Sequence, residues 1–559
     1  MVKKLSINKI IFLMAFLVSG LFLFNGCTFV NKVKELNETP PIMEISSDTI
    51  HEINVMELKE TPQDKTETVA DYIQGPELEK IELSLEECRA FTLENNLDLQ
   101  AELINPTIEE ENISQAEAQF EAAFSGSASY SKSDSPTDSL LIGSSSESSE
   151  INLGVDLPLR TGGTLSFDLV DSVSKTNSTW STLNPSYSNR FTASISQPLL
   201  KDAGRRASTY RIRVAQYNSS LVDLRTKLAV IRIIAEVDKA YWRLYASRRM
   251  LDVRKQQYDL AKATFEETER FVEVGAKPKI EIIRTKKTMA DTLEGIIRAE
   301  NDVRQREREL KRMINKKGLG METKTIIVPS SPPDPVHYDL DRKDMVEHAL
   351  LNRMEMLELE VQLAMNNMEI EYNRNQTFPD FTFNYRYNIS GLGADRGDSY
   401  DMLTDNDYNG HSFSLNVKVP IGNKRAKSQL RQSIYQRAQR LATRENRKAE
   451  IKSDVLNQID TLEATWQAIL ASRQNTILSD EQYRAEKRQY ELGLVKSTDV
   501  LDAQTNLAEA QRAEIASITE YQIALIDLAH ATGTLLGAAK VEWAPIDPIN
   551  ENIVVKSVE

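Results

Sequence analysis

Hydrophobic residues along this chain recur at helical spacing in some stretches and at every second position in others. Over about 83–122 the spacing predicts a helical stretch. The region 124–199 then contains stretches in which apolar residues alternate with Ser, Thr or Asn, which predicts strands separated by Ser-rich loops. Helical spacing returns over about 206–273, breaks at Gly275, and resumes over 279–315.

The second half of the chain repeats this order of elements. The same spacings predict a helix, two strands, a long helix and a final helix, over 340–377, 381–389, 413–421, 424–492 and 496–537. A loop rich in Gly and Asp is expected over 390–410, between the two strands.

Two kinds of landmark recur at matching places in the halves. Pro198 and Pro420 stand at the corners where a strand leads into a long helix, and Gly275 and Gly493 stand at the helix breaks. The distance along the chain from the first member to the second is nearly the same in both pairs. The chain is therefore interpreted as an internal duplication with a period near 220, far longer than the roughly 20 to 50 residues of a solenoid repeat.

The long helices need partners along their whole length. A helix of about 68 residues is about 100 Å long, because each residue adds 1.5 Å, and no single globular core is that wide. Apolar residues follow steps of three and four in both long helices, from Leu221 to Ile231 and from Val455 to Ile469. The helices are therefore expected to pack side by side as coiled coils.

The predicted strands have the length and pattern of membrane-crossing β-strands, and a water-soluble hairpin buried on one face is the alternative. After the apolar run near the N-terminus, no segment reaches 18 consecutive apolar residues, so crossing a membrane would require a closed β-barrel. Two hairpins cannot close a barrel, so several chains would be needed. The segments 151–159 and 164–170 are either two further barrel strands or an extracellular ribbon, and the pattern does not choose.

Composition excludes several classes of protein. The 559 residues include only 21 Gly and 18 Pro, fewer than separate small domains would need, and the net charge of −15 argues against a nucleic-acid partner. Two cysteines exclude a disulfide scaffold, and five scattered histidines share no metal-ligand spacing. No catalytic residue set, metal site or cofactor is expected, so the chain is not predicted to be an enzyme.

The N-terminus predicts export and lipidation. Three lysines precede an apolar run of 15 residues, 10–24, which is shorter than the roughly 20 residues of a membrane-spanning helix and is typical of a signal peptide. Residues 23–27, Leu-Phe-Asn-Gly-Cys, resemble a bacterial lipobox, so Cys27 is the expected lipidation site, and ordinary cleavage beside a chance cysteine is the alternative. Residues 28–80 hold 12 acidic and 5 basic residues and are expected to form a flexible tether.

Together with the duplicated order, several short motifs resemble the TolC family of outer-membrane efflux proteins. The resemblance covers about 81–537 and rests on Asn95-Asn96-Leu97 near the start, Phe378-Pro379-Asp380-Phe381 at a strand entry, the exits at Pro198 and Pro420, and Tyr490-Glu-Leu-Gly493 followed by Asp499-Val-Leu-Asp502-Ala. The boundaries it implies are a signal peptide (1–26), a lipidated tether (27–80), a first repeat (81–317, strands in 124–199), a linker (318–338), a second repeat (339–538, hairpin 381–421) and a tail (539–559).

The resemblance implies an α+β membrane protein that works as an export duct. Three chains, each giving two hairpins, would build one twelve-stranded outer-membrane β-barrel, continued by a periplasmic α-helical barrel. The implied partners are a periplasmic adaptor, an inner-membrane pump of the RND or ABC class, and outer-membrane lipid, in a Gram-negative bacterium. The duct would serve efflux or type I secretion, and its substrate cannot be inferred. The rival hypothesis is a lipid-tethered coiled coil that spans the periplasm without a pore.

The region after each glycine break is the predicted gate. Asp499 and Asp502 lie three positions apart and share a helix face, so a trimer would stack two rings of carboxylates able to bind cations. Glu281 follows Gly275 at the same distance as Asp499 follows Gly493. Asp499 is alternatively a helix cap or a solvated acid. The resemblance assigns Tyr490 to a latch of the closed state, although Val495 stands where the family's latch arginine is usual.

Overall fold

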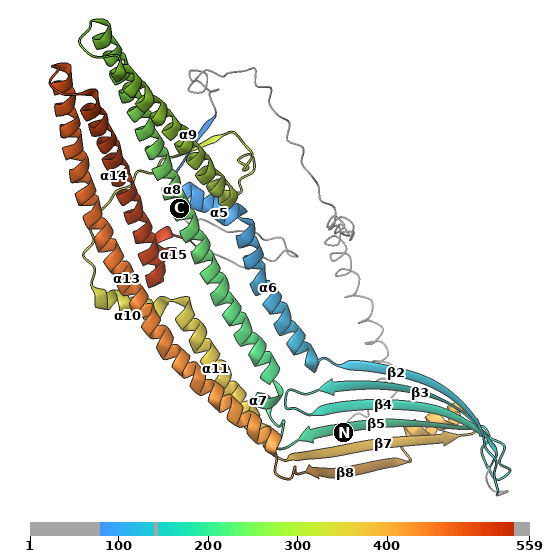
Figure 1. Cartoon of the computed structure of the whole chain (residues 1–559). Coiled ribbons are helices and arrows are strands. Elements are labelled where there is room, and N and C mark those ends of the chain that lie inside the picture. Colours follow the sequence, from blue (N-terminus) through green and yellow to red (C-terminus); the bar gives the residue numbers. More distant parts are fainter. Residues whose placement is uncertain (1–78, 139–142, 542–559) are drawn as a thin grey trace, which may run out of the picture.

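A computed structural model describes residues 79–138 and 143–541, an elongated molecule with long helices at one end and a sheet at the other (Figure 1). Its first half contains β1 (Lys80–Leu83), α5 (Leu85–Asn95), α6 (Leu97–Glu117), η1 (Ala118–Phe120), β2 (Ala123–Asp134), β3 (Ser145–Pro158), β4 (Thr164–Thr176), β5 (Ser186–Pro198), α7 (Arg205–Ser208), α8 (Tyr210–Glu273) and α9 (Ile280–Ile314). Its second half contains β6 (Ile326–Pro329), α10 (Arg342–Asn352), α11 (Met354–Asn375), β7 (Asp380–Gly393), α12 (Arg396–Asp405), β8 (Asn409–Lys418), α13 (Lys424–Glu491), α14 (Ser497–Thr532) and α15 (Leu535–Ala539).

The four long helices lie close to their predicted bounds, whereas the helix ahead of the strands is broken in both halves. Asn96 separates α5 from α6, and Arg353 separates α10 from α11, each with an extended backbone. The Asn96 side chain accepts a hydrogen bond of 2.8 Å from the backbone N–H of Leu99, so it caps α6. The prediction of one continuous stretch in each half is therefore wrong at these two residues. No helix in the described ranges is both long and apolar enough to cross a membrane.

Six strands form one antiparallel sheet in the order β2-β3-β4-β5-β7-β8. The expectation of two hairpins per chain is therefore wrong, because the region 124–199 is a meander of four strands. The segments 151–159 and 164–170, which the sequence left undecided, belong to β3 and β4 and lie between β2 and β5. The pairing of β5 with β7 joins the two halves of the chain into a single sheet.

The register gives the sheet one polar and one apolar face, because paired residues point to the same side. One polar row consists of paired residues from β3 to β8, namely Asp156, Ser166, Ser194, Arg386 and Ser412. The neighbouring row faces the other way and consists of Val155, Phe167, Ala193, Tyr387 and His411. The alternation predicted from the sequence thus extends across the whole sheet in register.

Two features escaped prediction. Strands β1 and β6 pair in parallel, although β6 lies in the expected linker, and four-residue strands carry too little pattern to be seen in a sequence. Within the expected loop 390–410, α12 packs on β5 and β7. Glycines permit this approach, since a Cβ atom on Gly391 would collide with the carbonyl of Ser399, and one on Gly393 would lie 2.6 Å from its backbone nitrogen.

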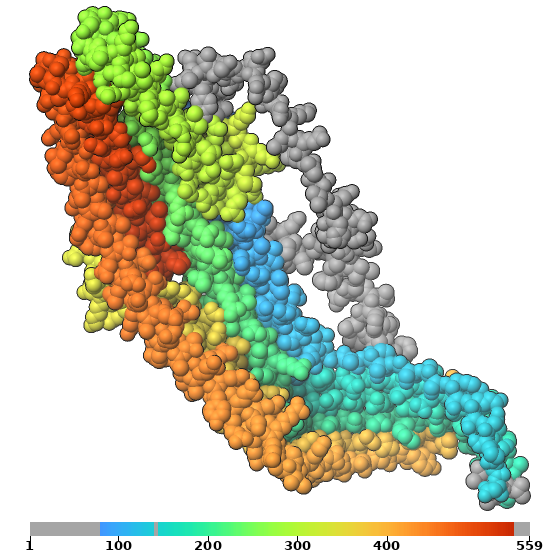
Figure 2. Space-filling model, in the orientation of Figure 1, coloured from blue at the N-terminus to red at the C-terminus, as the bar shows by residue number. Residues whose placement is uncertain are grey.

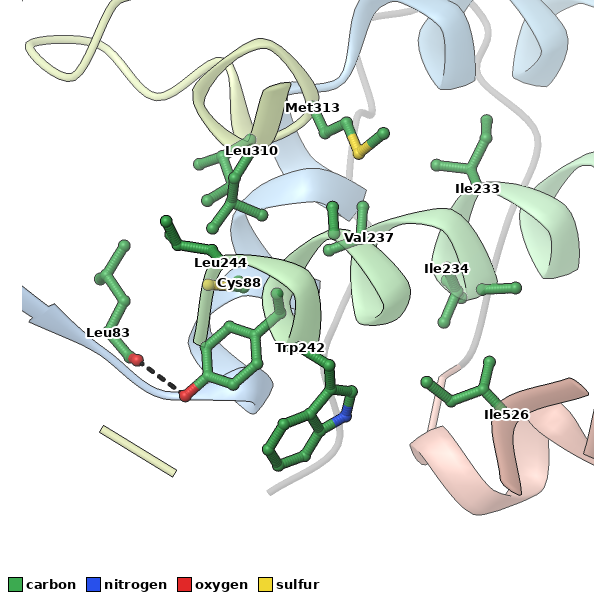
Figure 3. Packing of buried hydrophobic residues seen from close by; sticks show 14 of the residues in the cluster. Leu83, Cys88, Ile233, Ile234, Val237, Trp242, Leu244, Leu310, Met313 and Ile526 are labelled. Atoms are coloured by element: carbon green, nitrogen blue, oxygen red, sulfur yellow. Dashed lines mark hydrogen bonds between the residues drawn. The ribbon is translucent and has the colours of Figure 1, made fainter. Parts of the chain in front are cut away.

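The largest apolar core surrounds the middle of α8, where β1, α5, α9 and β6 meet it (Figure 3). The Tyr241 hydroxyl donates a hydrogen bond of 3.2 Å to the carbonyl of Leu83, which ties α8 to β1. Asp238 is fully buried beside this core and accepts two hydrogen bonds from Arg89 of α5, at 2.7 and 2.8 Å. Burial raises the pKa of the Asp238 carboxyl, and Arg89 offsets only part of that shift.

Candidate functional site

The helix pairs α8–α9 and α13–α14 end in two turns at the same end of the molecule (Figure 2). Gly275 and Gly493 both have φ of +74°, and the hydrogen bonds around them match. Ala276 N donates to Phe271 O and Gly275 N to Val272 O, while Leu494 N donates to Gln489 O and Gly493 N to Tyr490 O. Each break is therefore a Schellman motif with a left-handed glycine, which explains why glycine stands at both places.

Tyr490 holds the two turns together from the last turn of α13. This residue is 1% exposed, and its hydroxyl lies 2.8 Å from the hydroxyl of Thr268 on α8. Its ring meets the edge of Phe271, with 5.8 Å between the ring centroids. Val495, which stands where the family resemblance places an arginine, packs against the apolar cluster that Tyr490 forms with Tyr483, Val500, Ala503 and Leu507. The residue predicted as a latch is thus in contact with the other helix pair of its own chain.

Lys277 is the cation that the sequence did not identify. Its ammonium nitrogen lies 3.0 Å from the centroid of the Tyr490 ring and 4.8 Å from that of Phe271. This nitrogen is buried and has no hydrogen-bond partner among the described residues, so the ring faces are its principal contacts. A basic residue two positions after a helix break was the only signal in the sequence. The pairing with Tyr490, which stands in the other half of the chain, depends on tertiary structure.

Glu281 makes a second link between the helix pairs. It lies in the first turn of α9, is 7% exposed, and accepts hydrogen bonds from Arg284 at 2.8 Å and from Ser497 of α14. Ser497 is itself fully buried. The predicted gate acid is therefore paired inside the chain, on the contact between α9 and α14.

Asp499 and Asp502 lie apart from these contacts, on the exposed face of α14. The Asp499 carboxylate accepts a hydrogen bond of 3.1 Å from the backbone N–H of Lys496, so it caps the start of the helix. Val500 and Ala503, between and after them, are buried and point to the apolar cluster. The structure brings together Tyr490, Lys277 and Thr268, but within the described residues no three acidic or histidine side chains are close enough to hold a metal ion.

Both turns carry exposed apolar side chains. Val274 and Leu492, each directly before the glycine, are 77% and 69% exposed, and Leu494 is 72% exposed. Such exposed groups at equivalent places form an apolar surface at the end of the molecule.

The remaining predicted site residues lie elsewhere. Pro198 ends β5, and Pro420 follows β8, just before Gly422 and Asn423, whose positive φ angles turn the chain into α13. Proline has no N–H to extend the sheet ladder, which suits both strand ends. Cys27 lies outside the described residues, as do the predicted signal peptide, nearly all of the tether and most of the tail.

A family model described as outer membrane efflux protein matches residues 165–316 and 345–534, more than half of the chain. No curated protein matches this chain. The fold is similar to a membrane protein from Pseudomonas aeruginosa (TM-score 0.61, 18% identity, 80% of this chain and 93% of that one). It is also similar to the Campylobacter jejuni CmeC outer membrane channel (TM-score 0.59, 14% identity, 81% of this chain and 86% of that one). A third similar structure is the Neisseria gonorrhoeae MtrE outer membrane channel (TM-score 0.58, 18% identity, 81% of this chain and 89% of that one).

Proposed function

Since this chain belongs to the family of outer membrane efflux proteins, we propose that it forms the outer-membrane duct of a tripartite efflux or type I secretion system. An inner-membrane pump of the RND or ABC class would deliver substrate through a periplasmic adaptor. The observation that carries the proposal is the difference between the two ends of the molecule. An amphipathic sheet lies at one end and two matched helical turns at the other, joined by helices of 64 and 68 residues.

In this proposal the sheet lies in the outer membrane of a Gram-negative bacterium and the helices extend into the periplasm. The apolar face of the sheet contacts lipid, and the Ser- and Asn-rich face lines the duct. A lipid on Cys27 would anchor the N-terminus to the same membrane. A homotrimer closes the duct, and exposed apolar residues of α13, such as Leu470, Ile477 and Leu478, support a neighbouring chain along that helix.

The helical turns form the proposed gate and the adaptor contact. Exposed Val274, Leu492 and Leu494 offer an apolar docking surface for the adaptor. Lys277 over the Tyr490 ring, with the Glu281–Ser497 hydrogen bond, holds α8–α9 against α13–α14 in the closed state. Opening separates the two helix pairs, so it requires these contacts to break. Asp499 and Asp502, exposed on α14, would form the cation-binding rings of the trimer.

Single-channel conductance of the purified full chain in planar bilayers tests the duct. We expect rare openings in the parent and more frequent openings in Lys277→Met, because a cation–π contact worth about 0.5–2 kcal/mol is lost. Lys496→Met is the matched control, since this exposed lysine of the other turn makes no ring contact among the described residues. A verified trimer that never conducts, with or without adaptor, would favour the pore-free scaffold.

Divalent-cation block in the same recordings tests the acid rings. Combined Asp499→Ala and Asp502→Ala should weaken the block, whereas Glu281→Gln should leave it unchanged, because that carboxylate is occupied by Arg284 and Ser497. Unchanged block in the double variant would remove the two aspartates from this role.

A further inference from the structure

We infer that each chain contributes six strands to the barrel, so that three copies close an eighteen-stranded wall around a wide aqueous exit. The inference rests on the proposed function, because it takes the trimeric duct as given and concerns the size of its outer end. It departs from the twelve strands that the family resemblance implies.

The helix positions show that two strands have been added to the first half. Ahead of the sheet, α5 begins at Leu85 and its counterpart α10 begins at Arg342, which is an offset of 257 in the numbering. Beyond the sheet, the offset from Gly275 to Gly493 is only 218. The first half is therefore longer by 39 residues. These residues fall between α6 and the end of α8, which is where β3 and β4 lie.

The added strands are part of the wall. β3 pairs with β2 from Asp156–Ala123 to Ser145–Asp134, and β4 pairs with β5 from Thr164–Ser196 to Ser174–Ser186. β3 and β4 also pair with each other over their length, so both edges of each strand are paired. A separate extracellular ribbon would leave β2 beside β5, and here three strand spacings separate them.

Both added strands continue the two faces of the sheet in register. Leu153 pairs with Leu169, and Val155 with Phe167, within the band of apolar rows that Phe191 and Tyr387 extend on the neighbouring strands. Their opposite side carries Asn152, Asp156, Ser166 and Asp168, which match the polar face. Strands with lipid on one side and water on the other require this alternation.

The two outer strands leave unpaired edges that fit each other. β2 and β8 are the ends of the sheet, with 12 and 10 residues, and each lacks a ladder partner on its outer side within the described chain. The sheet is antiparallel with an even number of strands, so β2 runs opposite to β8 and can pair with β8 of a second copy. Unpaired backbone groups are costly in lipid, which favours a copy of this chain as the occupant.

Strand number sets the width of the exit. With strands about 4.8 Å apart and tilted by about 40°, eighteen strands give a backbone diameter of about 36 Å, against about 24 Å for twelve. A wall of this size leaves an aqueous channel rather than a plugged interior. The polar face would line it with Ser, Thr and Asn, so the outer exit admits bulky hydrated cargo and the helical turns alone set the size limit.

Disulfide trapping in intact cells distinguishes the two walls. Ser127→Cys on β2 with Asn152→Cys on β3, its register partner, should cross-link within one chain. Ser127→Cys with Arg190→Cys or Thr192→Cys on β5 should not, because three strand spacings exceed the reach of a disulfide. The reverse result would place β2 beside β5 and overturn the eighteen-stranded wall. The native Cys88 stays inert, since burial raises the pKa of its thiol to about 12.

A third pair separates this inference from the proposed function. Cysteines at Ser127 of β2 and at Ser412, Ser414 or Asn416 of β8 join neighbouring chains in either wall, so a covalent trimer is expected from at least one pair. A covalent trimer together with a β2–β5 bond would keep the duct and overturn the eighteen strands. Absence of any covalent trimer, with folded protein in the membrane, would overturn both.

The width itself is tested by labelling Ser194→Cys, on the polar face, with maleimides carrying polymers of graded size added from outside. Labelling should continue to polymer sizes that a twelve-stranded barrel excludes, and Ile195→Cys on the lipid face should stay unlabelled. A cut-off at the size expected for twelve strands would overturn the wide exit.

Discussion

The two long helices α8 and α13 hold equivalent places in the duplicated chain, yet they lie in different surroundings. α8 has 64 residues, of which 23 are buried, whereas α13 has 68 residues and buries 9. α8 contacts α5, α6, α9, α11 and α14, while α13 contacts mainly α10, α11 and α14. Similar periodicity therefore gives one helix at the centre of the molecule and one at its edge.

The edge helix α13 keeps apolar residues that its own chain does not cover. Four large aliphatic residues of α13 are exposed, namely Ile434, Leu470, Ile477 and Leu478. The comparable exposed residue near α8 is Val274, which lies in the turn after the helix. The proposed trimer would cover the α13 residues. Four predictions test the contrast, beginning with the largest effect.

Removing the ion pair of the central helix should cost most. Arg89→Ala leaves the carboxylate of Asp238 buried without a partner, which is expected to lower the free energy of unfolding by about 3–5 kcal/mol. The loss should shrink as the pH falls, because burial raises the pKa of Asp238 and its neutral form costs less to bury. Denaturant unfolding measures it. Arg342→Ala, which frees the exposed Asp460 of α13, should cost no more than about 1 kcal/mol.

Truncating apolar residues should reveal the same contrast. Leu244→Ala on α8 removes a side chain that is fully buried and should cost about 2–5 kcal/mol. Leu470→Ala on α13 should change the stability of the isolated chain by no more than about 0.5 kcal/mol and should instead weaken association between chains. Melting curves and sedimentation measure the two quantities. Equal losses of chain stability would contradict the distinction between a central and an edge helix.

The turns that follow the two helices should lose the same stability when their glycines are replaced, because the two turns have matching backbone geometry. Gly275→Ala and Gly493→Ala each force a Cβ into a left-handed conformation, which should cost about 1–2 kcal/mol. Apart from the glycine itself and its two neighbours in the chain, no atom of the described residues lies within 4 Å of either new Cβ, so backbone strain is the main effect. Thermal melting of the two variants checks this. Unequal losses would show that the turns differ in ways their matching hydrogen bonds do not explain.

The smallest predicted effect concerns pH and His530, near the end of α14. Burial, aided by Arg353, lowers the pKa of His530 below its ordinary value of about 6.5. The unfolded chain therefore takes up this proton first, so stability is full above about pH 6.5 and falls below it. Melting temperature should drop between pH 7.5 and 5.5, and less so in His530→Gln. The exposed His348→Gln should retain the full drop, and a retained drop in both would exclude His530 as its source.

The family resemblance drawn from the sequence is confirmed by the family match, and the long helices follow their patterns closely. Short or isolated signals failed. Asn96 and Arg353 interrupt helices whose apolar spacing continues across them, and α12 lies in a segment whose Gly and Asp content indicated a loop. Lys277 could not be paired with Tyr490, because a cation–π contact between distant segments leaves no local pattern. The roles of the predicted gate residues and of Cys27 stay predictions.

The sequence by itself determined the duplicated order, the long helices, the glycine breaks and the two-faced strands. Each of these depends on the spacing of apolar residues, on proline, or on the left-handed backbone that glycine allows. Such properties are local, so they can be recognised in the sequence. Tertiary structure decided which long helix is central, that β3 and β4 join the sheet, and that Lys277 meets Tyr490. These outcomes depend on which faces are buried against each other, and burial is a property of the assembled chain.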